Sequence, residues 1–185
     1  LGSADAFVTH SWQDDGAAKH AQLQTWARQF GERTPVIWLD KACIDQSDID
    51  ANLACLPVFL SGCRELLVLA GPTYHTRLWC VMELFTFVQM GGARERITIV
   101  ELDANARAAL AKFDAAKARC FLPKDRQHLM AVMETGFGDL RPFNTVVRRL
   151  LEERTVGREE RQRSSSWVGS RAGKLLRSSS ADVQI

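Results

Sequence analysis

One carboxylate stands alone in the most apolar helix-like segment of the chain. Residues 78–88 read LWCVMELFTFV, and Glu83 is the only charged residue among them. A segment that is apolar on all sides is typical of a helix buried over most of its surface. A carboxylate in such surroundings is costly unless it is paired, and it often has a raised pKa and a catalytic role. Glu83 is therefore the candidate catalytic residue. The structural alternative is a glutamate that caps a loop backbone or pairs with Arg77.

Other side chains offer weaker chemistry. Cys80 or Cys43 with His10 or His75 would make a thiol nucleophile pair, but buried and inert thiols are the favoured interpretation. The four histidines and five cysteines contain no closely spaced ligand pair, so no metal site is expected. Neither glycine-rich phosphate-binding motif occurs. Three acidic residues lack the glycine and terminal glutamate of a calcium loop, and we interpret them as a solvated turn and a helix start: Asp45, Asp48 and Asp50.

These residues must be positioned by regular elements, and apolar runs predict four strands, at 5–9, 35–39, 66–69 and 97–100. The continuous run at 35–39 is typical of a strand buried on both faces. Helical spacing predicts helices at 17–30, 49–60, 78–90, 104–118, 124–135 and 139–153, with Pro57 ending or kinking the second. Residues 40–48 are expected to form a polar loop.

Strands that alternate with helices predict an α/β fold, with a parallel sheet of four or five strands between layers of helices. Right-handed crossovers place every strand-to-helix loop at one edge of that sheet, where open α/β folds bind ligands. This edge collects residues 10–14, Asp40-Lys41 and residues 71–77. Glu83 lies five residues after Leu78, about 7.5 Å along the helix axis, and so close to the same edge.

The composition is ordinary for a globular protein but hides a split in charge. The 185 residues are 46% hydrophobic and carry a net charge of +2. Residues 1–153 carry a net charge of −2, whereas residues 154–185 carry +4 and seven of the eleven serines. We expect one folded domain over 1–153, with a helical extension from about residue 104, and a disordered basic serine-rich tail over 154–185. Stretches such as Arg161–Ser164 would suit a basophilic kinase, although a solvated tail is favoured.

Several classes of protein are disfavoured by these numbers. The folded part lacks the basic excess of a nucleic-acid-binding domain, and no apolar run approaches the ~18 residues that would cross a bilayer. Five cysteines without a CxxC pair indicate reduced thiols in a cytoplasmic protein. The first residue is Leu, which suggests a cut-out or processed piece.

Several motifs resemble those of Toll/interleukin-receptor (TIR) domains. Phe7-Val8-Thr9-His10 with Asp14 is similar to their opening strand, F-[ILV]-S-[FYH]-x-x-x-D, and Leu39-Asp40 to their acidic second loop. The most specific match is Trp79-Cys80-Val81-Met82-Glu83-Leu84, which resembles W-C-x-x-E-[LI]. The resemblance covers residues 4–103. Residues 38–46 also resemble a stretch of fungal heterokaryon-incompatibility domains, and the pattern is closest to TIR-like proteins of algae and oomycetes.

The resemblance implies a flavodoxin-like TIR fold in an immune or cell-death signalling module. Some family members cleave NAD⁺ at the nicotinamide–ribose bond, which would make this chain an NAD⁺ nucleosidase that uses NAD⁺ as substrate and needs no cofactor. Glu83 would then be catalytic, and the expected substrate-binding residues are His10, Ser11, Trp12, Asp40, Lys41 and Trp79. The alternative is a non-enzymatic adaptor that signals by self-association or by binding other TIR domains.

Overall fold

The structure, a computed structural model, describes residues 3–43 and 49–149. These residues belong to one compact unit, Leu1–Leu150. The expected tail at 154–185 lies outside the described residues, as do Asp45 and Asp48. The domain boundary predicted near residue 153 therefore stays a prediction.

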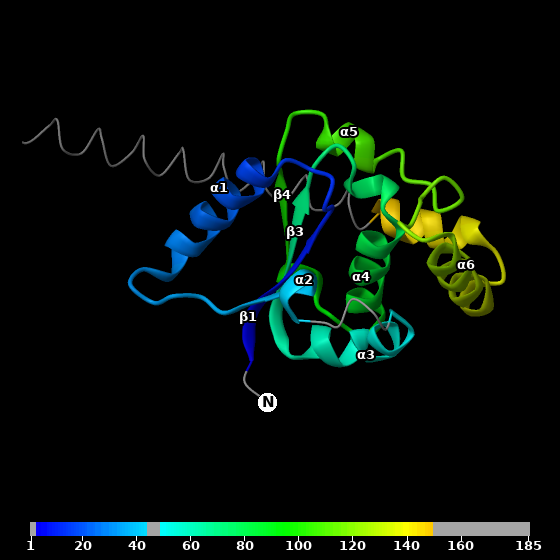
Figure 1. Cartoon of the computed structure of the whole chain (residues 1–185), viewed down its shortest axis with the longest axis horizontal. Helices are drawn as coiled ribbons and strands as arrows, with labels where there is room; N and C mark the ends of the chain where they lie inside the picture. The colour runs from blue at the N-terminus through cyan, green and yellow to red at the C-terminus, as the bar shows by residue number, and fades with distance from the viewer. Residues whose placement is uncertain (1–2, 44–48, 150–185) are drawn as a thin grey trace, which may run out of the picture. The chain divides into compact units, whose positions relative to one another are not determined.

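A four-stranded parallel sheet forms the centre of the unit, in the order β2-β1-β3-β4 (Figure 1). Its strands are β1 (Ala4–His10), β2 (Ile37–Leu39), β3 (Cys63–Ala70) and β4 (Ile97–Glu101). All three pairings are parallel, and the longest, between β1 and β3, runs from Ala4↔Cys63 to His10↔Leu69. The predicted α/β fold with a parallel sheet is confirmed, with four strands.

Helices cover both faces of this sheet. On one face lies α1 (Gly16–Ala27), which begins where the Asp15 side chain accepts a hydrogen bond from the Ala18 amide and continues into the 3-10 turn η1 (Arg28–Phe30). On the other face lie α3 (Ile49–Ser61) and α4 (Leu78–Gln89), as Figure 1 shows. Short 3-10 turns precede α4 and β4, namely η2 (Tyr74–Thr76) and η3 (Arg94–Arg96).

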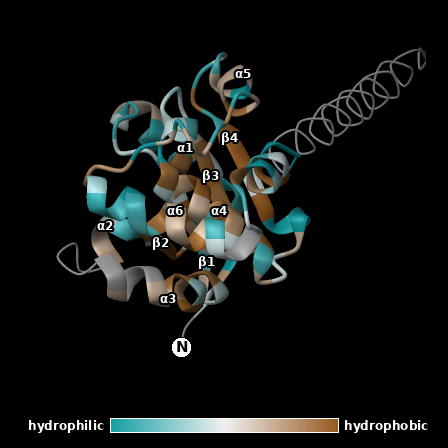
Figure 2. Cartoon of the chain, turned by 90° about the vertical axis from the view of Figure 1, so that its right-hand side faces the viewer, coloured by the Kyte–Doolittle hydropathy of each residue, from teal (hydrophilic) through white to brown (hydrophobic). Residues whose placement is uncertain are grey.

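The alternation of side chains along β1 and β3 divides the core into two layers. On the side that faces α1, Ala6 and Val8 of β1 and Leu67 and Leu69 of β3 form one buried cluster with Trp26 of α1. Residues of the opposite parity therefore face α3 and α4, including Phe7, Thr9 and Val68, all at most 1% exposed. The strands and α4 are mainly hydrophobic, whereas the short helix α2 (Asp40–Cys43) begins with two hydrophilic residues (Figure 2).

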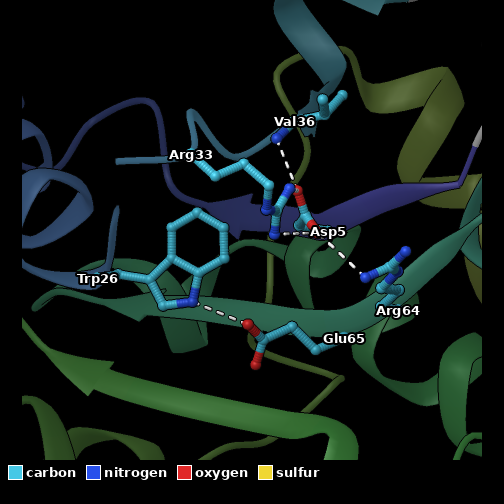
Figure 3. Close-up of polar contacts among 6 residues, drawn as sticks. All are labelled: Asp5, Trp26, Arg33, Val36, Arg64 and Glu65. Atoms are coloured by element: carbon cyan, nitrogen blue, oxygen red, sulfur yellow. Dashed lines mark hydrogen bonds and ion pairs between the residues drawn. The ribbon is translucent and has the colours of Figure 1, made fainter. Parts of the chain in front are cut away.

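The amino edge of the sheet is closed by a polar cluster (Figure 3). Arg33 donates two hydrogen bonds to the Asp5 carboxylate, at 2.7 and 2.9 Å, and the Val36 amide donates a third at 2.8 Å. These hydrogen bonds lower the pKa of Asp5 to about 2. The indole of Trp26 donates to Glu65 at 2.8 Å from the α1 side. The cluster ties α1 and the segment before β2 to the start of the sheet.

The chain after β4 adds further helical segments. They are α5 (Ala106–Leu110), α6 (Pro123–Phe137) and a helical stretch at 140–149. Figure 1 places α6 on the far side of α4 from the sheet. Phe143 is fully buried and packs on Phe85 of α4, with ring centroids 4.9 Å apart. The expected helical extension is thus present and packs on α4.

Several local predictions were wrong. The run at 35–39 was expected to be buried on both faces, but β2 is an edge strand and Val36 is 59% exposed. Residues 40–43 form α2 rather than a loop. The helix α3 continues past Pro57 to Ser61, so of the two outcomes expected at Pro57, the ending of the helix is wrong. The helix expected at 104–118 is only the short α5, followed by turns. Cys43, which was expected to be a buried thiol, is exposed, and so is Cys55.

Candidate functional site

Glu83 lies in the second turn of α4, on the face that packs against β1. Its side chain is 9% exposed, and α4 is buried over most of its surface. The pKa of Glu83 is raised to about 8, chiefly by burial and to a smaller extent by the nearby charge of Asp40, while a hydrogen bond with Thr9 acts to lower it. At neutral pH the carboxyl group is therefore mainly protonated, and a nearby cation would favour its ionised form.

A group of buried oxygens lies beneath this carboxyl group. The Thr9 hydroxyl oxygen, at the end of β1, is 3.1 Å from the Tyr74 hydroxyl oxygen. The Tyr74 hydroxyl also donates to the backbone carbonyl of Cys80, at 3.0 Å. Both side chains are fully buried. Three elements, β1, η2 and α4, therefore meet through hydrogen bonds next to Glu83.

The two loops that precede α1 and α4 are held together by a second set of hydrogen bonds. Asp14 Oδ1 accepts from the Thr73 amide at 2.9 Å and from the Thr73 hydroxyl at 2.7 Å. The Ser11 and Thr73 hydroxyl oxygens are 2.7 Å apart. Asp14 packs so closely on Gly71 that a Cβ there would lie 2.4 Å from its Oδ2. The β1–α1 loop thus fixes the segment that leads into α4.

A third contact joins the first loop to α2. The indole nitrogen of Trp12 donates to Asp40 Oδ2 at 2.9 Å, and the Trp12 side chain is half-exposed. Burial lowers the pKa of His10, whereas the charge of Asp40 acts to raise it. Since Asp40 also acts on Glu83, it connects the two loops electrostatically to the carboxyl group of α4.

The structure brings the sequence-predicted residues to one edge of the sheet, in different roles. Trp12 and Asp40 are in direct contact, and the Ser11 hydroxyl is engaged by Thr73. Lys41 lies in α2, and the partly buried Trp79 lies in the first turn of α4. In the part of the chain that the structure describes, no ion pair joins Glu83 to Arg77, so the structural alternative of that pairing is not observed.

No protein-family model and no curated protein matches this chain. The TIR domains in a structure of the activated Roq1 resistosome, which directly recognizes the pathogen effector XopQ, are similar in structure. The match covers 82% of this chain and 82% of that chain, with a TM-score of 0.50 and 15% sequence identity. The chain has a TIR-like fold. No comparison bears on the resemblance to algal and oomycete proteins.

Two other kinds of chemistry were considered from the sequence, a cysteine nucleophile and a metal site. The Cys80 thiol donates to the His10 carbonyl at 3.3 Å, and burial raises its pKa well above the usual range, so it is a poor nucleophile. Among residues 3–43 and 49–149, no three His, Cys, Asp or Glu side chains are grouped as metal ligands would be. No helix in those ranges is both long and apolar enough to span a bilayer.

Sequence reasoning missed the residues that hold the site together. Thr9 and Asp14 are part of the matched TIR-type motif, but neither was assigned to the site. Thr73 and Tyr74 lie in the loop that was assigned to the ligand edge. Tyr74 is the only tyrosine of the chain, and its position just before the most apolar helix is the one signal that could have marked it.

Proposed function

We propose that this domain cleaves NAD⁺ at the nicotinamide–ribose bond, with Glu83 as the catalytic carboxylate. One observation carries the proposal. Glu83 is a buried carboxyl group with a raised pKa, at the edge of the sheet where α/β folds bind ligands. The TIR-like fold and the match to W-C-x-x-E-[LI] support the same residue.

The chemistry suits a carboxylate of this kind. When the glycosidic C–N bond breaks, its electron pair leaves with nicotinamide, and positive charge builds at the anomeric carbon. A carboxylate beside that carbon stabilises the charge, and water then adds to the carbon and releases a proton. The nicotinamide ring of NAD⁺ is itself cationic, so its binding would shift Glu83 toward the ionised form. Trp79 and Trp12 are the aromatic side chains proposed to contact the ring, with His10, Ser11, Asp40 and Lys41 around the rest of the substrate.

The test is nicotinamide release by the full chain at high protein concentration. We expect turnover by the wild type, a loss of about 100-fold or more in Glu83→Gln, and a rise in kcat/KM as the pH is raised through about 8, where Glu83 of the free protein ionises. Glu65→Gln is the matched control, because Glu65 is a partly buried glutamate at the opposite edge of the sheet and should leave turnover unchanged. Equal release, or none, from wild type and Glu83→Gln would contradict the proposal.

A scaffold is the second candidate function. The observation in its favour is that the structurally similar TIR domains are those of a resistosome, a name that denotes an assembled complex. A scaffold requires self-association, which Glu83→Gln should leave unchanged in light scattering while nicotinamide release is absent from both proteins. A monomer with turnover supports the enzyme instead. In either case we place the domain in the cytoplasm, where free thiols such as Cys43 and Cys55 stay reduced.

A further inference from the structure

The loop between α5 and α6 (Figure 1) exposes an apolar pair of side chains to solvent. Phe121 is 86% exposed, more than any other large hydrophobic side chain in the described part of the chain, and its neighbour Leu122 is 37% exposed. A single exposed hydrophobic residue is ordinary on a protein surface. The surroundings of this pair therefore decide whether it is a binding site.

The backbone on both sides of the pair is held in place. Before it, the Arg119 amide donates to the Thr76 carbonyl at 2.7 Å, and the Leu78 amide donates to the Arg119 carbonyl at 3.1 Å. After it, the Arg126 side chain of α6 donates to the Ala118 carbonyl at 3.0 Å. The loop is thus fixed to the start of α4 and to α6, so it presents the apolar pair from a preorganised position.

The charged side chains of this loop are all basic. Residues 115–124 contain Lys117, Arg119 and Lys124 and no aspartate or glutamate. All three basic residues are exposed, and the Lys117 side chain is 84% exposed. The loop therefore carries a charge of +3 next to the apolar pair.

The nearest acidic residues in the sequence leave this charge largely in place. Asp125 is buried, with 6% exposed. Asp114 forms a long ion pair with Lys117, at 3.7 Å, and its Oδ1 also accepts from the Ala116 amide and from Asn144 Nδ2, both at 3.1 Å. An ion pair on the surface is weak, so Lys117 stays available to an anionic partner.

We propose that this loop binds anionic membranes: Phe121 and Leu122 insert into the interface of the bilayer, and Lys117, Arg119 and Lys124 contact the lipid headgroups. An apolar pair flanked by basic residues matches an anionic bilayer in both hydrophobicity and charge. A protein partner would need a pocket shaped for the phenylalanine ring, whereas lipid chains adapt to it.

The sequence also supplies a second signal for the membrane. One inserted apolar group gives marginal and reversible binding, which a polybasic segment strengthens. Residues 154–185 of the same chain carry a charge of +4. Because Arg119 is hydrogen bonded to Thr76 and Leu78, membrane binding by the loop would hold the start of α4 near the bilayer surface. The proposal does not depend on NAD⁺ cleavage.

The test is co-flotation of the full chain with two kinds of vesicle, phosphatidylcholine alone and phosphatidylcholine with about 30% phosphatidylserine. We expect the wild type to bind only the second kind, and less tightly as NaCl is added, because salt screens the basic residues. Phe121→Ser should lower the partition coefficient about tenfold or more, since it removes the inserted ring. Phe121→Trp keeps an aromatic ring suited to the interface and should retain binding.

Two matched controls separate this loop from apolar and charged residues elsewhere. Val58→Ser removes a side chain that is 57% exposed on α3, a helix without Lys or Arg, and should leave binding unchanged. Lys124→Glu and Arg28→Glu change the net charge equally, but Arg28 is exposed in η1, on the face of the sheet that α1 covers. Lys124→Glu should weaken binding about fivefold or more relative to Arg28→Glu, because only Lys124 lies beside the inserted pair.

The proposal fails if the wild type binds neither kind of vesicle, or binds both kinds equally. Equal binding of the wild type and Phe121→Ser to anionic vesicles would also overturn it, because basic residues alone, such as those of the tail, would then account for binding. Light scattering without lipid decides the remaining alternative. If the wild type self-associates and Phe121→Ser does not, the apolar pair is a contact between copies of the chain and the membrane site is wrong.

Discussion

The carboxyl group of Glu83 links the ionisation of one residue to the stability of the whole fold. Its pKa is about 8 in the folded protein against an ordinary value of 4.5, because burial disfavours the charge. The folded state binds the Glu83 proton more tightly than the unfolded chain does. This proton's contribution to the free energy of unfolding is fully present below pH 4.5 and is lost as the pH rises through about 8. Glu83→Gln keeps the shape of the side chain but removes this ionisation.

We therefore expect Glu83→Gln to have little effect on the free energy of unfolding near pH 5 and to raise it at pH 9. The gain at high pH should be roughly 2 to 4 kcal/mol, since each unit of pKa shift corresponds to about 1.4 kcal/mol and relaxation of the site lowers the total. Urea denaturation at the two pH values measures both numbers. A gain that is the same at pH 5 and pH 9 would show that the pKa of Glu83 is not raised in the folded domain.

At this scale the sequence singled out Glu83, the proposed catalytic residue, but not the residues that surround it. Glu83 was recognisable because a single charge in an apolar helix needs a reason. Thr9 and Tyr74 carry no such signal, because a threonine in a strand and a tyrosine before a buried helix are ordinary occupants of their positions. Their role depends on the contact between β1 and α4, which residues 71 apart in the sequence make only after folding.

At the scale of elements, the loop before α4 is fixed by its fit to the loop before α1. Gly71 leaves no room for a side chain, because a Cβ would lie 2.4 Å from both Cγ and Oδ2 of Asp14. Gly71→Ala must push Asp14 away and weaken its hydrogen bonds to Thr73. We expect a loss of about 1–3 kcal/mol in the free energy of unfolding, the usual range for overpacking, measurable by urea denaturation.

Gly16→Ala is the control for that substitution. Gly16 is the first residue of α1, and a Cβ there would meet nothing within 4 Å. Alanine has the higher helix propensity, so this variant should be as stable as the wild type or slightly more stable. Equal effects at the two glycines would mean that the contact between Gly71 and Asp14 does not limit the loop.

The elements also differ in how far the hydropathy pattern of the sequence predicts them. The strands β1, β3 and β4 were predictable from apolar runs, and α4 from its length and its Gly91-Gly92 terminus. The run that ends in β2 has the same hydropathy, but its place at the edge depends on strand order, which hydropathy does not contain. Pro57 is tolerated inside α3, a tertiary outcome that helix propensity alone does not predict. Helical spacing over 104–118 likewise did not predict how short the helix is, because α5 covers only Ala106–Leu110.

At the scale of the whole described unit, the helices after β4 and the sheet share one core. Phe143, at 140–149, packs on Phe85 of α4 and lies 6.1 Å from Phe113 between ring centroids. Arg148 donates to the Phe113 carbonyl at 2.7 Å, and the Leu78 amide at the start of α4 donates to the Arg119 carbonyl at 3.1 Å. The extension therefore supports the helix that carries Glu83, and the two should unfold together.

Phe143→Ala tests this coupling. The ring is fully buried, so its removal should cost about 3–5 kcal/mol, as is usual for a phenylalanine in a core. Because the extension and the sheet share that core, the loss should appear in a single transition, followed both by tryptophan fluorescence and by circular dichroism. Phe121→Ala is the control, since Phe121 is 86% exposed and its removal leaves no cavity. Two separate transitions in Phe143→Ala would mean that the extension unfolds on its own, and Glu83 would then depend on the sheet and α4 alone.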